Sequence, residues 1–271
     1  MLIDQNTNLF CVVGYPIGHS LSPIMHNTAF NIMNLNAVYL AFETEDIEDF
    51  VKGVRAFGVK GASVTIPHKT SVMKMLDELD ETAIKIGAVN TIVNRSGILV
   101  GYNTDAIGAF KALEEKISIN GKSCIIVGAG GAAKAIGYIL KENGTDLKVA
   151  NRSQKRGEEL ADLLSCPFIP LDKIEGVEAD ILVNTTPVGM FPEIAKCPVP
   201  ENILKKGMVV MDIIYNPIKT KLLAAAESRS CCIIDGLSMF IKQGAEQFRL
   251  WTGLEPPLKE IKEAVTKVLR A

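Results

Sequence analysis

The stretch that decides the fold is residues 124–133, Cys-Ile-Ile-Val-Gly-Ala-Gly-Gly-Ala-Ala. Its four apolar residues predict a buried strand, its glycines predict a tight turn, and the residues from there to about Leu140 have the pattern of a helix. A strand, a glycine-rich turn and a helix in this order are typical of a dinucleotide-binding unit, because the backbone can then approach a pyrophosphate at the helix N-terminus. A tight turn that binds nothing is the alternative interpretation.

On both sides of this stretch, short apolar runs alternate with longer amphipathic ones, a pattern typical of βα units and a parallel sheet. No flexible linker divides the chain, so we expect a helix at 106–116 to join two such series. The first series contains the predicted strands 9–13, 37–42 and 59–66, a hairpin with strands 91–93 and 98–100, and helices at 46–57 and from Ser22. The second contains the strands 124–127, 147–150, 181–183, 208–214 and 232–234, followed by a helical region, 237–271, interrupted near Gly253.

Composition and charge exclude several classes of protein. The chain has 271 residues, 48 % of them hydrophobic, and 29 Lys and Arg against 31 Asp and Glu, unlike a disordered chain or a dedicated nucleic-acid binder. No apolar stretch reaches the roughly 18 residues of a membrane span, and Asp4 stands where a secretion signal carries basic residues. The spacing of the six cysteines and three histidines predicts reduced thiols, structural histidines and no metal site. We therefore expect a cytoplasmic protein that binds neither nucleic acid nor membranes.

The end of the next strand indicates which dinucleotide is bound. A site for NAD carries Asp or Glu roughly 20 residues after the glycines, where it accepts hydrogen bonds from the ribose 2′-hydroxyl. Here Asn151-Arg152-Ser153 ends the strand, and Lys155 and Arg156 follow. Guanidinium groups bind a 2′-phosphate, which a carboxylate would repel. The sequence therefore favours NADP, with a solvated basic turn as the alternative.

Other segments place polar side chains where predicted strands end. Residues 184–190 form either a ligand loop or an ordinary Pro/Gly loop. Ser20 and Ser22 stand at a helix start and suit a carboxylate, although N-capping explains Ser22 equally well. Lys69 would act as a general acid or base in a cleft, or be a surface lysine. Asp105 would be a site residue or a helix cap. Together these residues indicate an NADP-dependent oxidoreductase with a polar substrate.

Nine segments along nearly the whole chain resemble those of the shikimate dehydrogenase family, in the same order. The departures are small: Ser153 where Thr is common, Phe240 where Leu is common, and Tyr102, which would narrow the pocket or pack against its neighbours. The matching segments are Gly-His-Ser-Leu-Ser-Pro (18–23), Val-Thr-Ile-Pro-His-Lys (64–69), Gly-Ala-Val-Asn-Thr (87–91), Asn-Thr-Asp (103–105), Gly-Ala-Gly-Gly-Ala (128–132), Asn-Arg-Ser (151–153), Asn-Thr-Thr-Pro-Val-Gly-Met (184–190), Asp-Ile-Ile-Tyr-Asn-Pro (212–217) and Gly-Leu-Ser-Met-Phe-Ile-Lys-Gln-Gly-Ala (236–245).

The resemblance implies an α/β fold of two domains. An N-terminal substrate-binding domain, 1–105, would be completed by C-terminal helices, 238–271, that pack back on it. Residues 106–237 would form a Rossmann-type NADP-binding domain. The implied reaction is the reversible, NADPH-dependent reduction of 3-dehydroshikimate to shikimate, a step in the biosynthesis of aromatic amino acids (chorismate).

The resemblance also implies a role for particular residues. Lys69 and Asp105 would be the catalytic pair, the lysine either transferring a proton to the reacting oxygen or stabilising its charge. The substrate would contact Ser20, Ser22, Thr65, Lys69, Asn90, Asp105, Tyr215 and Gln243. The cofactor would contact Gly128, Ala129, Gly130, Gly131, Ala132, Asn151, Arg152, Ser153, Arg156, Thr186, Met190 and Gly236.

Three alternatives compete with this interpretation. A quinate/shikimate dehydrogenase would accept more substrates or NAD, but the two arginines after strand 147–150 oppose a preference for NAD. A non-catalytic NADP-binding sensor would not need both Lys69 and Asp105. A methylene-tetrahydrofolate dehydrogenase has related domains, but the two serines at 20 and 22 do not suit a folate. Monomer and homodimer are both compatible with the sequence.

Overall fold

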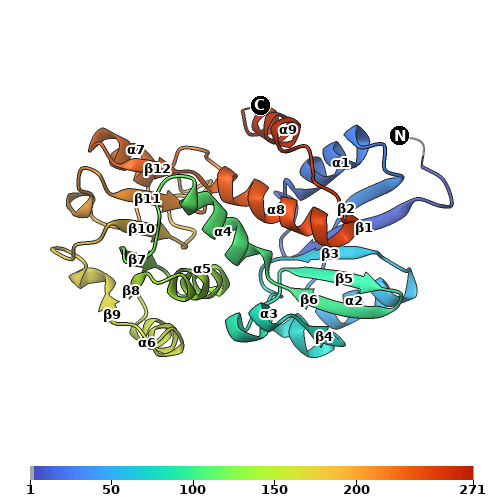
Figure 1. Cartoon of the computed structure of the whole chain (residues 1–271), viewed down its shortest axis with the longest axis horizontal. Coiled ribbons are helices and arrows are strands. Elements are labelled where there is room, and N and C mark those ends of the chain that lie inside the picture. Colours follow the sequence, from blue (N-terminus) through green and yellow to red (C-terminus); the bar gives the residue numbers. More distant parts are fainter. Residues whose placement is uncertain (1–2, 271) are drawn as a thin grey trace. The chain divides into compact units, whose positions relative to one another are not determined.

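The computed structural model describes residues 3–270, which divide into two compact units (Figure 1). Unit 1 is formed by Met1–Thr104 and Gln243–Ala271, and unit 2 by Asp105–Lys242. The chain passes between the units within the helices α4 (Thr104–Glu114) and α8 (Gly236–Thr252), so a helix and not a loop makes each passage. The sequence placed these divisions after residues 105 and 237, and the structure divides after 104 and 242.

Unit 2 contains a six-stranded parallel sheet, as the βα pattern predicts. Its order is β12–β11–β10–β7–β8–β9, which is the doubly wound arrangement of a Rossmann-type sheet. The strand order reverses between β7 and β10, and ligands of such sheets bind at the carboxyl ends of the strands near this point. The strands are β7 (Ser123–Val127), β8 (Asp146–Asn151), β9 (Phe168–Pro170), β10 (Ile181–Asn184), β11 (Val209–Asp212) and β12 (Cys232–Ile234).

Apolar side chains of β7 are buried on both faces of this sheet. Cys124 and Ile126 belong to one core, with Ile136 of α5 (Gly131–Glu142), while Ile125 belongs to another, with Leu222 of α7 (Lys221–Ser228). Because successive side chains in a strand alternate between faces, a strand covered on both sides is a continuous apolar run. This is why the stretch at 124–127 carries so clear a signal in the sequence. Helix α6 (Gln154–Leu163) and the short 3-10 helices η2 (Leu171–Lys173) and η3 (Glu201–Ile203) complete the unit.

Unit 1 contains a mixed sheet of the order β2–β1–β3–β5–β6–β4. The strands β5 and β6 form the predicted hairpin, and Ser96 and Gly97 in its turn have φ values of 54° and 100°. Two consecutive positive φ values match the twist of a two-residue hairpin turn. The strands are β1 (Asn8–Gly14), β2 (Ala37–Glu43), β3 (Gly61–Val64), β4 (Glu78–Leu79), β5 (Thr91–Arg95) and β6 (Ile98–Tyr102).

Helix α1 (Ser22–Ile32) begins differently from the prediction. Ser22 is its first residue and not its N-cap, because Leu21 (φ −92°, ψ 0°) already takes the cap position. The backbone N–H of Ser22 is then one of the unpaired donors at the helix start, and Ser20 Oγ accepts from it at 3.3 Å. The prediction that Ser22 caps the helix is therefore wrong, and Ser20, one residue before the N-cap, supplies an acceptor to a single N–H at the helix start.

The C-terminal helices pack on the first unit, as predicted from the family resemblance. Helix α9 (Leu258–Leu269) packs against α1, and Phe10 of β1 lies between Phe30 of α1 and Trp251 of α8, at centroid distances of 5.2 and 5.4 Å. On the other face of this sheet lie α2 (Ile47–Ala56), the 3-10 helix η1 (Ser71–Met75) and α3 (Glu81–Ile86).

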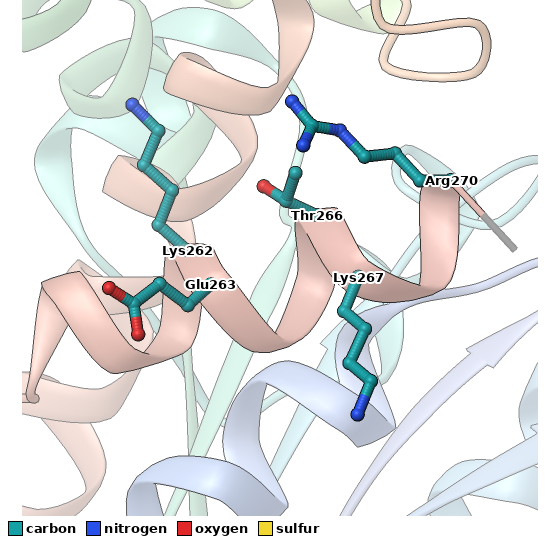
Figure 2. A pocket seen from close by; sticks show the side chains of 5 residues that line it. All are labelled: Lys262, Glu263, Thr266, Lys267 and Arg270. Atoms are coloured by element: carbon teal, nitrogen blue, oxygen red, sulfur yellow. The ribbon is translucent and has the colours of Figure 1, made fainter.

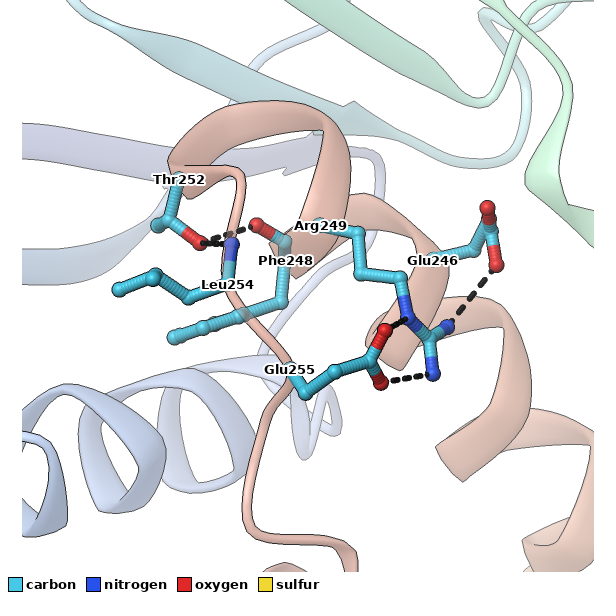
Figure 3. A network of polar contacts seen from close by, with 6 residues as sticks. All are labelled: Glu246, Phe248, Arg249, Thr252, Leu254 and Glu255. Atoms are coloured by element: carbon cyan, nitrogen blue, oxygen red, sulfur yellow. Dashed lines mark hydrogen bonds and ion pairs between the residues drawn. The ribbon is translucent and has the colours of Figure 1, made fainter.

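The predicted helix break near Gly253 is confirmed, and Arg249 fixes the chain there. Its guanidinium lies between Glu246 and Glu255 (Figure 3), donating to Glu246 at 2.9 Å and to both carboxylate oxygens of Glu255. Gly253 has a φ of +71°, which suits the residue after a helix end. Thr252 Oγ1 donates to the carbonyl of Phe248, so the last turn of α8 is satisfied before the chain enters α9.

Three general properties of the described residues complete the description of the fold. Between residues 3 and 270, no helix combines the length and apolar character of a membrane span, and no group of three potential metal ligands is found. All six cysteines are free thiols.

Candidate active site

In unit 1, the candidate substrate residues follow strands that end at one edge of the sheet. β1 and β3 are parallel neighbours, so the loops that carry Ser20, Ser22 and Lys69 leave the sheet on the same side. β5 is antiparallel to β3, so Asn90, which precedes it, lies at this edge too. β6 is antiparallel to β5 and leads into Asp105, the second residue of α4. The topology of unit 1 therefore brings the segments that carry Ser20, Ser22, Lys69 and Asn90 to one edge of its sheet, and Asp105 is the first residue of unit 2.

The loop after β3 is held at several points of its backbone. The N–H of His68 donates to the carbonyl of Thr65, and the N–H of Val89 donates to the carbonyl of Lys69 at 2.8 Å. The ring of His68 is buried, and its Nε2 lies 2.7 Å from the carbonyl oxygen of Thr44. His68 thus has a structural role, and it fixes the backbone just before the half-buried Lys69.

Several hydrogen bonds hold the side chain of Asn90. It is 3 % exposed, and its Oδ1 accepts from the backbone N–H of Thr104 at 2.7 Å and from Thr91 Oγ1 at 2.8 Å. Its Nδ2 donates to Thr104 Oγ1 at 3.0 Å. Because Thr104 directly precedes Asp105, the same bonds fix the chain beside that carboxylate.

Sequence reasoning missed Gln247, which lies one helical turn after Gln243 on α8. Both glutamines are buried, at 1 % and 8 % exposure. Gln247 Nε2 donates to the carbonyl of Asn90 and to Thr91 Oγ1, so it reaches the candidate site through these two residues. Two buried amides spaced i, i+4 lie on one face of a helix, and this spacing is the sequence signal that could have found Gln247.

In unit 2, the glycine turn after β7 allows a close approach of two backbones. Gly128 has a φ of +117°, and a Cβ there would lie 2.4 Å from Thr185 Oγ1, so only glycine fits. Gly130 is the N-cap of α5 and offers no side chain to the first N–H groups of that helix. These N–H groups are donors that an anion can satisfy.

The two arginines after β8 are exposed, Arg152 in the turn that follows the strand and Arg156 in the first turn of α6. Arg152, Ser153 and Arg156 are exposed, and within residues 3–270 neither guanidinium makes an ion pair with a carboxylate. Asn151 Nδ2 donates to the carbonyl of Ser153 at 2.9 Å, which fixes the turn that carries Arg152. The turn and the start of α6 therefore present two positive charges after the carboxyl end of β8.

A buried carboxylate supports the loop after β10. Asn184 and Asp212 are opposite each other on neighbouring strands, and Asn184 Nδ2 donates to Asp212 Oδ1 at 3.0 Å. Asn184 Oδ1 accepts from the backbone N–H and the hydroxyl of Thr186, at 3.0 and 2.7 Å. Burial raises the pKa of Asp212 to about 6, against the opposing effect of its hydrogen bonds. Asp212 thus positions Thr186 through Asn184.

Of the remaining candidates of unit 2, Tyr215 follows β11, Gly236 begins α8, and Met190 lies in the loop after β10. The ring of Tyr215 packs on Phe240 at a centroid distance of 5.0 Å, and burial raises the pKa of its hydroxyl. A Cβ at Gly236 would lie 2.4 Å from the carbonyl oxygens of Ile213 and Ile214, so α8 begins in direct contact with the end of β11. Met190 is exposed.

A separate pocket lies along α9, as Figure 2 shows, and contains none of the candidate residues. Its side chains come from one helix and its C-cap, and most are charged and point in different directions. They are Lys262, Glu263, Thr266, Lys267 and Arg270.

The structure thus groups the candidate residues into two sets, one in each unit. Those of unit 1 are Ser20, Ser22, Thr65, Lys69, Asn90 and Gln243, and those of unit 2 are Asp105, Tyr215 and the candidate cofactor residues. The doubly wound sheet, with a glycine turn where its strand order reverses, puts the protein in the class of two-domain α/β proteins with a Rossmann-type unit.

Within that class, the chain belongs to the shikimate dehydrogenase family. Three family models match it: "Shikimate dehydrogenase substrate binding domain" at residues 12–92, "Shikimate / quinate 5-dehydrogenase" at 111–221, and "Shikimate 5'-dehydrogenase C-terminal domain" at 236–266. The shikimate dehydrogenase (NADP(+)) of Thermococcus kodakarensis is 45% identical over 260 residues, which are 94% of each chain.

Solved structures agree with this assignment. A crystal structure of a shikimate dehydrogenase in complex with NADP+ has a TM-score of 0.93 and 42% identity, covering 99% of this chain and 98% of its own. The shikimate 5-dehydrogenase of Thermus thermophilus, in complex with NADP(H) and shikimate, has a TM-score of 0.90 and 36% identity, covering 96% and 99%.

Proposed function

We propose that this chain is an NADP-dependent shikimate dehydrogenase, an oxidoreductase that reversibly reduces 3-dehydroshikimate to shikimate in the biosynthesis of aromatic amino acids. The observation that carries the proposal is the edge of the unit 1 sheet, where hydroxyl, ammonium and amide groups follow successive strands in a chain of this family. A triol acid needs such a mixture of donors and acceptors, because an unpaired buried polar group penalises analogues.

Unit 2 is the proposed NADP-binding domain. NADP, when bound, accepts a hydride from the substrate or its reduced form supplies one. Two features of this chain support the fit: the N–H groups at the start of α5 suit a pyrophosphate, and the unneutralised Arg152 and Arg156 suit a 2′-phosphate. We assign to the same site Gly128, Ala129, Gly130, Gly131, Ala132, Asn151, Ser153, Thr186, Met190 and Gly236.

Unit 1 is the proposed substrate domain. The hydroxyls of Ser20 and Ser22 donate to the substrate carboxylate, and Ser22 begins α1, whose first N–H groups favour an anion. We assign the ring hydroxyls and the remaining contacts to Thr65, Asn90, Asp105, Tyr215 and Gln243.

Lys69 and Asp105 are the proposed catalytic residues. Reduction of the carbonyl places negative charge on its oxygen, and the Lys69 ammonium donates a hydrogen bond there, where such a group stabilises the transition state. A proton must reach this oxygen before the alcohol is complete, and Lys69 either supplies it or holds the charge until it arrives. Asp105 accepts a hydrogen bond from a ring hydroxyl and so orients the substrate.

The proposal is tested with four pairs of reactants, shikimate or quinate with NADP or NAD, followed by nicotinamide absorbance. We expect fast reduction of the cofactor only with shikimate and NADP. Comparable rates with quinate or NAD would indicate the broader quinate/shikimate specificity and contradict the role of the arginines. Binding of NADP without any turnover would indicate a non-catalytic sensor.

We also infer that the enzyme works in the cytoplasm on small molecules. All six cysteines are free, which suits a reducing compartment. Sedimentation of the purified chain distinguishes the monomer from the homodimer.

A further inference from the structure

Gln247 links two strands of unit 1 that carry no direct bond between their side chains. Ser63 of β3 and Thr91 of β5 are opposite each other in the sheet. Gln247 Oε1 accepts from Ser63 Oγ at 2.9 Å, and its Nε2 donates to Thr91 Oγ1 at 2.9 Å and to the carbonyl of Asn90 at 3.2 Å. Every polar atom of this buried amide is therefore bonded, which is the condition under which such a network stabilises one arrangement.

Backbone groups of known polarity fix the orientation of both amides in this network. The carbonyl of Asn90 can only accept, so the atom of Gln247 that faces it is Nε2. The backbone N–H of Thr104 can only donate, so the atom of Asn90 that faces it is Oδ1. The Thr91 hydroxyl accepts from Gln247 and donates to Asn90 Oδ1, and it also lies 3.3 Å from Thr104 Oγ1, where either hydroxyl can be the donor. The Asn90 amide consequently cannot flip, and one hydrogen of its Nδ2 is directed at Thr104 Oγ1.

The other arm of the network leads to Tyr39. Ser63 Oγ accepts from the hydroxyl of Tyr39 at 2.6 Å. Burial holds the pKa of Tyr39 well above its usual value, so its hydroxyl stays protonated and remains a donor. Gln247 thus stands at the middle of a chain of hydrogen bonds whose two ends are Tyr39 and Asn90.

We propose that Gln247 is a positioning residue for the substrate: together with Thr104, it holds the Asn90 amide in one orientation, because it binds the Asn90 carbonyl and the Thr91 hydroxyl that donates to Asn90 Oδ1. The inference rests on the proposed function, in which Asn90 binds shikimate. Groups held in advance in the binding orientation need not be ordered when the substrate arrives. Without the Gln247 amide, the Thr91 hydroxyl can rotate away from Asn90, and the Asn90 amide is then held by Thr104 alone.

The test is Gln247→Leu, which keeps most of the side-chain volume and removes both hydrogen-bonding arms. We expect the KM for shikimate to rise about 10-fold or more and the KM for NADP to stay within about two-fold, because the arms reach only groups of unit 1. The matched control is Val54→Ala on α2, a buried core residue on the other face of the same sheet. Its melting temperature falls, but its KM for shikimate stays close to that of the unmodified chain.

A pair of substitutions at Thr91 keeps the inference testable if Gln247→Leu does not fold. Thr91→Val removes the hydroxyl that connects Gln247 to Asn90 and should raise the KM for shikimate. Thr91→Ser keeps this hydroxyl, and its KM for shikimate should stay close to that of the unmodified chain. If Thr91→Val and Gln247→Leu both fold, the double variant should raise the KM for shikimate by less than the product of the two single increases. Both substitutions break the same path of hydrogen bonds to Asn90.

The outcomes separate the inference from the proposed function. No oxidation of shikimate by the unmodified chain would overturn the proposed function and the inference together. If the unmodified chain oxidises shikimate normally, two results would overturn the inference alone. Gln247→Leu could raise the KM for shikimate and the KM for NADP equally, or it could leave the KM for shikimate unchanged, as Val54→Ala does. The same holds if Thr91→Val leaves the KM for shikimate unchanged.

Discussion

In both units, a polar network that links neighbouring strands supports the candidate site, but only the network of unit 2 contains a charged group. In each unit, two residues opposite each other on neighbouring strands are linked: Ser63 and Thr91 through Gln247 in unit 1, and Asn184 and Asp212 directly in unit 2. The network of unit 1 consists of hydroxyls and amides, which do not titrate. That of unit 2 is built on a carboxylate. The comparison therefore predicts that the network of Ser63, Thr91 and Gln247 keeps its hydrogen bonds over the pH range in which Asp212 gains a proton.

The hydrogen bonds to Asp212 in unit 2 compensate only part of the cost of burying its charge. Asp212 accepts from Thr220 Oγ1 at 2.7 Å, from Asn184 Nδ2 at 3.0 Å and from the N–H of Ile214 at 3.2 Å. These bonds lower its pKa, but burial raises it more, so the charged form is less favourable than in water. A neutral network avoids this cost, since each of its groups needs a partner only for its hydrogen bonds.

The largest effect is expected in unit 1, from Lys69→Ala. Loss of the ammonium group should lower kcat by about 10³-fold, the usual size of a general acid–base contribution, with NADP affinity nearly unchanged. Stopped-flow turnover and fluorescence titration with NADPH measure the two quantities. Lys74→Ala, an exposed lysine on η1, is the control and should behave as the unmodified chain does. Retained turnover in Lys69→Ala would remove this lysine from the mechanism.

The corresponding effect in unit 2 is expected from Arg152→Ala combined with Arg156→Ala. The Kd for NADP should rise about 100-fold and that for NAD by less than about three-fold, because only NADP carries the 2′-phosphate. Lys155→Ala removes a neighbouring charge outside the proposed site and serves as the control. Isothermal titration calorimetry with each cofactor measures the two Kd values, for NADP and for NAD, and hence their ratio. Equal losses for NADP and NAD would contradict the assignment of these arginines.

The same comparison explains which parts of the molecule could be predicted from sequence. The turn at Gly128 and the end of β8 at Asn151 follow from local patterns, because a buried parallel strand and its turn leave a continuous apolar run before the glycines. The three residues of β9 were missed, since so short a strand has no periodicity. The bond between Ser63 and Gln247 joins residues 184 positions apart. A contact of that kind depends on the tertiary fold, so local patterns cannot predict it.

A smaller effect, on stability, is expected from Asp212→Asn. The pKa of Asp212 is higher in the folded chain, about 6, than the usual 3.8, so the folded chain binds the proton more tightly. The free energy of unfolding should therefore fall as pH rises from about 4 to about 6, by at most about 3 kcal/mol, and Asp212→Asn should remove that fall. The asparagine can still accept from Asn184 and donate to Thr220. Urea unfolding at a series of pH values measures the slope.

A carboxylate with the opposite shift provides the control for this slope. Hydrogen bonds from the backbone and hydroxyl of Ser123 lower the pKa of the exposed Asp180 in the same unit. Asp180 therefore stabilises the fold above its unfolded pKa and loses this effect as pH falls, so Asp180→Asn should flatten the profile at the acid end. An unchanged slope between pH 4 and 6 in Asp212→Asn would show that Asp212 does not titrate there.

The smallest effect is expected from Tyr102→Phe, which tests where the neutral network of unit 1 ends. Tyr102 of β6 lies opposite Thr91, so Ser63, Thr91 and Tyr102 form a row across three strands. Its hydroxyl, however, accepts from the exposed Arg95 at 2.7 Å, in a bond at the surface of the hairpin. Loss of this surface bond should change the free energy of unfolding by about 0.5 kcal/mol or less and leave the KM for shikimate unchanged, unlike Thr91→Val. A raised KM would instead extend the network to a third strand, and Tyr102 would then belong to the substrate side and not only to the packing of the hairpin.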